Sequence, residues 1–339
     1  MSLQRQKEFQ RNPHLECLLS ELNGLLVLSE DQVIGGFQQP NYPVVFLMGC
    51  ARSGTTLALQ WLASTGLFSY PSNLISRFYA APYIGARIQQ MLTDSRFDFA
   101  NEFGLSVDTG SQAFSSNLGK THGLLSPNEF WYFWRRFFPD GETQEFQASQ
   151  LIDVDSDSLV AEIAALESVC DRPVTMKGMF LNWNIPFLAG LFDKALFVHI
   201  RRHPFYNMQS LLMARQRFYG SEEQWYSFKP PEFSELRNRP VAEQIAGQLY
   251  YTNRAIETGM AQLSPERCLT LDYEMLCQQP ADSFNQLAAK LAAQDFVVSE
   301  NYGGPEKFKA QGSVRLPETQ TRELMDAYRD LSKESLTTV

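Results

Sequence analysis

The chain has 339 residues, of which 44% are hydrophobic and 20% charged, so it is long enough to bury the core of a large globular domain. Its formal net charge of −9 argues against a general binder of nucleic acids or anionic membranes, and an anionic ligand would have to be held by local cations. The sequence has no run of 18 or more apolar residues, so it predicts no transmembrane segment.

The first forty residues are polar except for one stretch, 15–28, whose apolar residues recur at helical spacing. This pattern predicts an N-terminal helical extension over residues 1–40 that packs on the rest of the chain. No Gly/Ser-rich linker divides the remaining sequence, so residues 41–339 are expected to form one domain.

An apolar run at 44–48 precedes a loop of small residues and a helical pattern, and this order predicts a phosphate-binding loop. Gly49 and Gly54 stand five residues apart, as in the P-loop of nucleotide-binding proteins. Thr55 occupies the position of the P-loop lysine, and Arg52 places a cation inside the loop instead. The loop therefore suits a phosphate-bearing ligand whose negative charge is compensated by a cation inside the loop, before the helix begins.

Residues 74–92 are predicted to form one amphipathic helix. Residues 100–128 are rich in Gly, Ser, Asn and Thr, and they are expected to be a long irregular segment of the kind that is often functional. The aromatic run at 130–138 follows, and such runs at helical spacing belong more often to a core than to a ligand pocket.

Further strands are predicted at 174–176, 196–200 and 268–271, each followed by a helical stretch. Alternation of strand and helix predicts a single α/β domain with a central parallel sheet flanked by helices and a P-loop-like phosphate-binding loop. The strand at 196–200 runs into a charged turn that contains Arg202, and Ser210 lies in the helix beyond it.

The five cysteines are odd in number and show no C-x-x-C spacing. Together with the lack of an N-terminal signal segment, this predicts free thiols and a cytoplasmic location. No His/Cys/carboxylate spacing fits zinc, so no metal site is expected.

Residues 51–57, A-R-S-G-T-T-L, resemble the 5′-phosphosulfate loop of sulfotransferases, commonly written P-K/R-S-G-T-T. Arg202 and Ser210 have the spacing of that family's 3′-phosphate motif, and Pro204 matches its R-D/H-P variant. A third segment, 271–276 with Pro280, is similar to the Y-E-D-L…P segment of many members.

The resemblance implies an enzyme that transfers a sulfuryl group from 3′-phosphoadenosine 5′-phosphosulfate (PAPS) to a hydroxyl or amine without a metal. Under it, the loop residues bind the 5′-phosphosulfate, and Arg202 and Ser210 bind the 3′-phosphate, with Arg201 as the alternative if the register slips by one. The loop residues are Gly49, Arg52, Ser53, Gly54, Thr55 and Thr56. The acceptor could be a small molecule, a carbohydrate or a lipid.

Arg52 is the candidate catalytic cation, and its help would be electrostatic because an arginine does not give up its proton. The acceptor hydroxyl also needs a general base. His122 is preferred because it lies in the irregular segment, where such bases usually reside, and Glu129 is second because some sulfotransferases use a glutamate.

The competing hypothesis is a P-loop nucleotide-dependent kinase, with Asp272 at a strand end as a Walker B-like aspartate. Against it, Thr55 replaces the P-loop lysine, and the pair Arg202 and Ser210 would have no role. A non-enzymatic binding module would be expected to lose the loop glycines and Arg52, and all of them are present.

Overall fold

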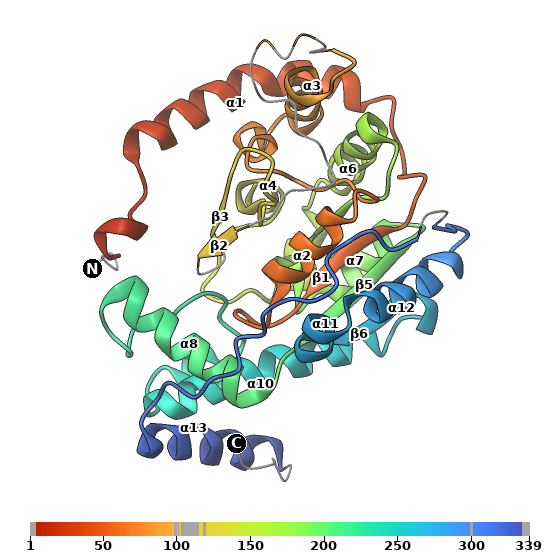
Figure 1. The fold of residues 1–339 in the computed structure, drawn as a ribbon. Helices are drawn as coiled ribbons and strands as arrows, with labels where there is room; N and C mark the ends of the chain where they lie inside the picture. Colours follow the sequence, from red (N-terminus) through yellow and green to blue (C-terminus); the bar gives the residue numbers. More distant parts are fainter. Residues whose placement is uncertain are drawn as a thin grey trace.

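The computed structural model describes residues 5–97, 100, 102, 115–117, 120–298 and 301–333. Within them, a four-stranded parallel sheet forms the centre of the molecule, with strand order β4-β1-β5-β6 (Figure 1). Its strands are β1 (Val44–Met48), β4 (Thr175–Lys177), β5 (Ala195–Arg201) and β6 (Cys268–Asp272). The predicted α/β fold with a central parallel sheet and flanking helices is confirmed, and each predicted strand lies within two residues of an observed one.

Strand β1 is apolar throughout because both of its faces are covered, as is usual in a parallel sheet. Phe46 and Met48 point into one core cluster, whereas Val45 and Leu47 point into another on the opposite face. The molecule is therefore a three-layer structure with helices on both sides of the sheet.

One face of the sheet is covered by three helices, α2 (Thr55–Ser64), α11 (Tyr273–Gln278) and α12 (Pro280–Ala292). The other face is covered by α4 (Trp131–Phe137), α6 (Ser156–Cys170), α7 (Ile185–Leu191) and α10 (Val241–Met260). A third cluster joins α10 to α8 (Pro204–Tyr219) and α13 (Glu318–Ser332).

The N-terminal segment contains η1 (Lys7–Phe9) and α1 (Pro13–Ile34). Asn12 caps α1 and Pro13 occupies its first position, a favourable start for a helix. Helix α1 packs on α3 (Pro82–Thr93) and α6. The division of the chain at residue 40 stays a prediction.

The helix predicted at 74–92 is two elements, η2 (Ile75–Phe78) and α3. Pro82 explains the break, because it disfavours helical backbone at Ala81 and lacks the N–H that a continuous helix needs. The segment at 100–128 contains a hairpin of β2 (Ser115–Asn117) and β3 (Lys120–His122), and much of the rest lies outside the described residues.

The remaining short elements are α5 (Ala148–Ile152), η3 (Met179–Leu181), α9 (Phe233–Leu236) and η4 (Pro265–Arg267). In the described part of the chain, no helix is both long and apolar enough to cross a membrane.

Candidate active site

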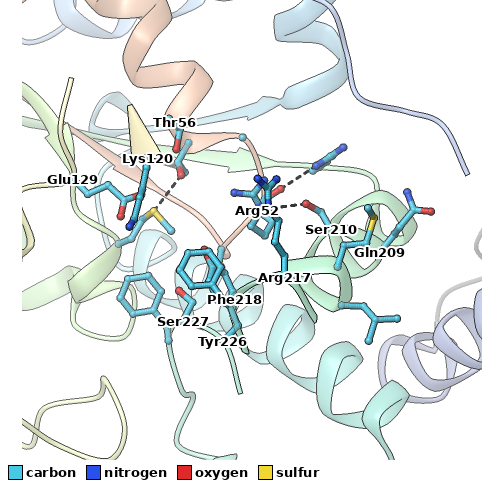
Figure 2. Close-up of a pocket in the computed structure, with 18 of the residues that line it drawn as sticks. Arg52, Thr56, Lys120, Glu129, Gln209, Ser210, Arg217, Phe218, Tyr226 and Ser227 are labelled. Carbon is cyan, nitrogen blue, oxygen red and sulfur yellow. Dashed lines mark hydrogen bonds between the residues drawn. The ribbon is translucent and has the colours of Figure 1, made fainter. Parts of the chain in front are cut away.

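The carboxyl ends of the four central strands lie along one edge of a single cavity of about 1070 Å³ (Figure 2). The loop after β1 lines this cavity, together with Lys177 from β4, Arg202 just after β5 and Tyr273 just after β6. Ligands of open parallel sheets bind at this edge, because the loops that follow the strands meet there.

The loop after β1 turns sharply to reach α2. Arg52 has φ 70° and Gly54 has φ 108°, both in the left-handed region that side chains disfavour. A Cβ atom on Gly54 would lie 2.3 Å from Cδ2 of Tyr273, so the ring of Tyr273 requires a glycine at this position.

The N-terminus of α2 is open to an anion. Gly54 is its N-cap, and no side chain of the described residues caps it. The N–H groups of its first turn therefore have no intrahelical acceptor, and the helix dipole points its positive end into the loop. The hydroxyl of Ser53 is buried beside them and has no partner among the described residues. An anion that reached this loop would supply the missing acceptors.

The structure brings together Arg52, Arg202 and Ser210, which are far apart in the sequence. Nε of Arg52 donates to Oγ of Ser210 at 3.1 Å, and Nη1 of Arg202 donates to the carbonyl of Arg52 at 3.1 Å. The guanidinium of Arg202 also lies 4.8 Å from the centre of the Tyr273 ring and donates to the carbonyl of Gln311. The loop predicted for the 5′-phosphosulfate and the pair predicted for the 3′-phosphate thus form one cluster.

The choice between Arg201 and Arg202 follows from the strand. Arg201 points away from the cavity and pairs with Glu257 at 3.6 Å on the surface. Arg202 lines the cavity, and its buried Nε has no partner among the described residues. Burial lowers the pKa of this guanidinium from its ordinary value.

Lys177, which no sequence motif indicated, is a buried cation beside the loop. Its Nζ donates to Oγ1 of Thr56 at 2.7 Å and to Oε1 of Glu129 at 2.5 Å, while the side chain is only 4% exposed. Trp131 donates from its indole N–H to the other oxygen of Glu129. A lysine that ends a buried strand is unusual, and this was the signal that the sequence offered.

The pair Glu129 and Lys177 is electrostatically coupled. Burial would raise the pKa of Glu129. The charge and hydrogen bond of Lys177, with the hydrogen bond of Trp131 and the charge of Arg52, together outweigh burial, so the pKa lies below its ordinary value. Burial lowers the pKa of Lys177, and the negative charge of Glu129 offsets this only in part. The site therefore holds a carboxylate that accepts protons and an ammonium that donates hydrogen bonds, side by side.

The structure does not bring His122 to this cluster. Its side chain is exposed on β3, and its carbonyl accepts a hydrogen bond from Ser126. None of the four histidines is among the described residues that line the cavity. His199 is buried within β5, where its Nε2 lies 3.3 Å from Oδ1 of Asn253.

The aromatic run divides between core and cavity. Phe133 and Trp134 are buried in the core, as expected, but Trp131 and Tyr132 line the cavity beside Glu129. Opposite them, the segment after α8 contributes Tyr226 and, 5.0 Å from the ring of Trp131, Phe228. This part of the cavity can bind an apolar or planar group.

No group of three or more metal-binding side chains occurs among the described residues. The groups that could hold a ligand are instead N–H donors, hydroxyls and cations. They fit a multiply charged phosphate ester, since both the buried hydroxyl of Ser53 and Nε of Arg202 lack partners there.

A model of a sulfotransferase family matches residues 43–295, about three quarters of the chain. Among solved structures, the chain is similar to the sulfotransferase STF9 of Mycobacterium avium, with 14% identity, 95% of this chain and 82% of that chain covered, and a TM-score of 0.50. It is also similar to the sulfotransferase STF1 of Mycobacterium tuberculosis H37Rv, with 11% identity, 84% and 74% coverage and a TM-score of 0.47. No curated protein sequence matches significantly.

Proposed function

The chain belongs to the sulfotransferase family, and on that premise we propose that it transfers a sulfuryl group from PAPS to a hydroxyl or amine. One observation carries the proposal. Arg52 in the loop after β1 is hydrogen-bonded to Ser210 in α8 and to Arg202 after β5, so both predicted phosphate-binding motifs face one cavity.

The two motifs divide the donor between them. The N–H groups at the start of α2, with the hydroxyls of Ser53 and Thr56, would bind the 5′-phosphosulfate. Arg202 and Ser210 would bind the 3′-phosphate, and charge-assisted hydrogen bonds of this kind contribute roughly 1.5–3 kcal/mol each. When bound, PAPS supplies the sulfuryl group and the 5′-phosphate that leaves.

Glu129 is the base that the geometry favours. It is the carboxylate at the apolar part of the cavity, and its lowered pKa keeps it ionised near neutral pH. Glu129 would take the proton of the acceptor hydroxyl as the new oxygen–sulfur bond forms. His122 remains the alternative from the sequence, and it would need to move into the cavity to act.

Lys177 and Arg52 would stabilise the negative charge that develops on the departing 5′-phosphate. Lys177 already bonds Thr56 in the loop, and Arg52 is held by Ser210. Fixed donors of this kind act without reorganising during the reaction, which is why they lower the barrier. Burial also lowers the pKa of Lys177, so its proton is easier to release than that of an ordinary lysine.

The kinase hypothesis lacks a comparable observation. It requires a carboxylate in the cavity that could hold Mg²⁺ near the phosphates. Asp272 is exposed at the start of α11 and is not among the described residues that line the cavity. The carboxylate that does lie close to the loop, Glu129, is already paired with Lys177.

The test is a calorimetric titration with adenosine 3′,5′-bisphosphate in EDTA, and separately with ATP and Mg²⁺. We expect the bisphosphate to bind without metal, and R202A to weaken it about 10- to 100-fold. R201A is the matched control, because that arginine is the neighbour that points away from the cavity. Binding of ATP with Mg²⁺ alone, or equal effects of the two variants, would contradict the proposal.

A further inference from the structure

Resting on the proposed sulfotransferase function, we propose that the acceptor is an anion, an alcohol or amine that also bears an acidic group. That acidic group would lie against Lys120 and Arg217, two cations that the phosphate-binding motifs do not include. Both residues line the cavity (Figure 2).

The cavity is strongly cationic in an acidic protein. Eleven of its lining residues are lysine or arginine, and two are glutamate. The whole chain has 29 basic and 38 acidic residues, so more than a third of the basic side chains lie around this one cavity. A cavity so charged attracts anions even though the net charge of the protein repels them.

The donor accounts for only part of this charge. Arg52, Lys177 and Arg202 surround the phosphate-binding loop, and Lys309 and Arg315 lie on the C-terminal segment beside it. The other six cations come from the N-terminal segment, β3, α4, and α8 with the loop beyond it, and they are Arg5, Arg11, Lys120, Arg135, Arg217 and Lys229. A donor bound by the two phosphate motifs leaves these six cations to the acceptor.

Lys120 and Arg217 are held in place by one aromatic ring. Phe9 of the N-terminal segment is 4% exposed and stacks on Phe218 of α8 with ring centres 3.9 Å apart. Nζ of Lys120 lies 5.3 Å from the centre of the Phe9 ring, and the guanidinium of Arg217 lies 5.9 Å from it. Two cations from distant elements thus lie within 6 Å of the centre of one ring, and cation–π attraction holds both of them at this wall of the cavity.

Carboxylates of the protein compensate these cations only weakly. Arg217 pairs with Glu8 at 3.5 Å and Arg11 with Glu16 at 3.9 Å, all four side chains being substantially exposed. Lys120 forms no ion pair with a described carboxylate, and neither do Arg5, Arg135 or Lys229. Exposed pairs contribute little, so an incoming anion would find most of this positive charge available.

The surroundings of the proposed base indicate what kind of group carries the reacting hydroxyl or amine. Glu129 accepts a hydrogen bond from Trp131, and the rings of Tyr226 and Phe228 line the same cavity, so the reacting hydroxyl or amine would sit on an apolar or planar body. The acidic group would extend from that body toward Lys120 and Arg217. The acceptor class is therefore an amphiphilic acid rather than a neutral alcohol.

The test uses two fluorescent probes with the same anilinonaphthalene rings. They are 8-anilinonaphthalene-1-sulfonate and N-phenyl-1-naphthylamine, which lacks the sulfonate and is uncharged. Each is titrated into the protein with and without saturating adenosine 3′,5′-bisphosphate. We expect the sulfonate to bind in the presence of the nucleotide. The double variant K120Q/R217Q should weaken the sulfonate at least about tenfold and leave the uncharged probe unchanged. Displacement by hexanoate, hexyl sulfate and 1-hexanol then compares a carboxylate, a sulfate ester and a neutral alcohol.

The matched control is R322Q/K333Q, which removes the same charges from exposed positions that do not line the cavity. Equal weakening of both probes by K120Q/R217Q, equal loss in the control, or displacement by 1-hexanol as good as that by the acids would overturn the proposal. Failure of the bisphosphate to bind would instead overturn the sulfotransferase function. The titrations without nucleotide would still show whether Lys120 and Arg217 bind the sulfonate.

Discussion

Nζ of Lys177 lies 2.5 Å from Oε1 of Glu129 and 2.7 Å from Oγ1 of Thr56, so one ammonium joins the candidate base to the phosphate-binding loop. The three residues come from β4, from the segment before α4 and from α2. In the proposed reaction, the group that takes the acceptor's proton and the group that stabilises charge on the donor would therefore be hydrogen-bonded to each other.

Replacing Glu129 by glutamine should abolish most of the transfer while sparing the donor. The amide cannot take a proton, so kcat is expected to fall about 10²- to 10⁴-fold. The affinity for adenosine 3′,5′-bisphosphate should stay within about threefold, because the hydrogen bonds of Glu129 go to Trp131 and Lys177 and not to the phosphate-binding loop. Transfer of radiolabelled sulfate and calorimetry measure the two quantities. H122Q serves as the comparison, and a larger loss in H122Q than in E129Q would restore the histidine as the base.

Replacing Lys177 by methionine should both slow the reaction and change its pH dependence. Loss of one fixed donor to the developing charge typically lowers kcat by about 10²- to 10³-fold. The positive charge of Lys177 is also what lowers the pKa of Glu129, so its removal should raise that pKa. Because the base acts when ionised, the acidic limb of the pH–rate profile should move to higher pH. An unmoved limb would mean that the two groups are not coupled during turnover.

The fold could be predicted because β1 and most of β5 are apolar runs, which are typical of buried parallel strands. The strand predictions at 44–48 and 196–200 lie within one residue of β1 and β5 at each end. The predicted phosphate-binding residues also lie next to strand ends, within short motifs that can be identified from the sequence alone. What the sequence could not show is which of two neighbouring side chains, Arg201 or Arg202, faces the cavity, since this depends on the pleat and on Glu257.

The pairing of Lys177 with Glu129 was beyond prediction for a different reason, although Glu129 itself was the second candidate for the base. The two are 48 residues apart, and only the pairing of β4 with β1 brings Lys177 beside the phosphate-binding loop. Neither residue lies in a motif, and a lone lysine in a buried strand does not reveal its partner. The preference for His122 followed from its place in an irregular segment, whereas the structure holds its side chain on the outside of a hairpin.

Alanine at Gly54 should damage the loop more than alanine at another glycine with positive φ. Gly54 has φ 108° and lies against Tyr273, whereas Gly66 has φ 72° and a Cβ atom there would have no neighbour within 4 Å. G66A should therefore cost only the backbone strain, about 1–2 kcal/mol. G54A should cost at least about 2 kcal/mol more from the overlap with the ring, and it should abolish binding of the bisphosphate. Urea denaturation and calorimetry check both, and equal stability of the two variants would contradict the proposed role of Tyr273.

His199 should make the fold sensitive to acid. Burial lowers the pKa of this imidazole to about 4, below its ordinary value of about 6.5. The folded state therefore favours the neutral ring, and the stabilisation is complete above pH 6.5 and is lost as the pH falls from there toward 4. In H199Q, which can still bond Asn253 but does not titrate, this component is absent.

Between pH 7 and pH 5, the wild type should thus lose about 2 kcal/mol of unfolding free energy relative to H199Q. The difference between the two proteins isolates His199, because every other titrating group is common to both. Urea denaturation at the two pH values gives that difference directly. A constant gap between wild type and variant would show that the imidazole is hydrated or charged in the folded protein, and that the centre of β5 is less tightly closed than its packing indicates.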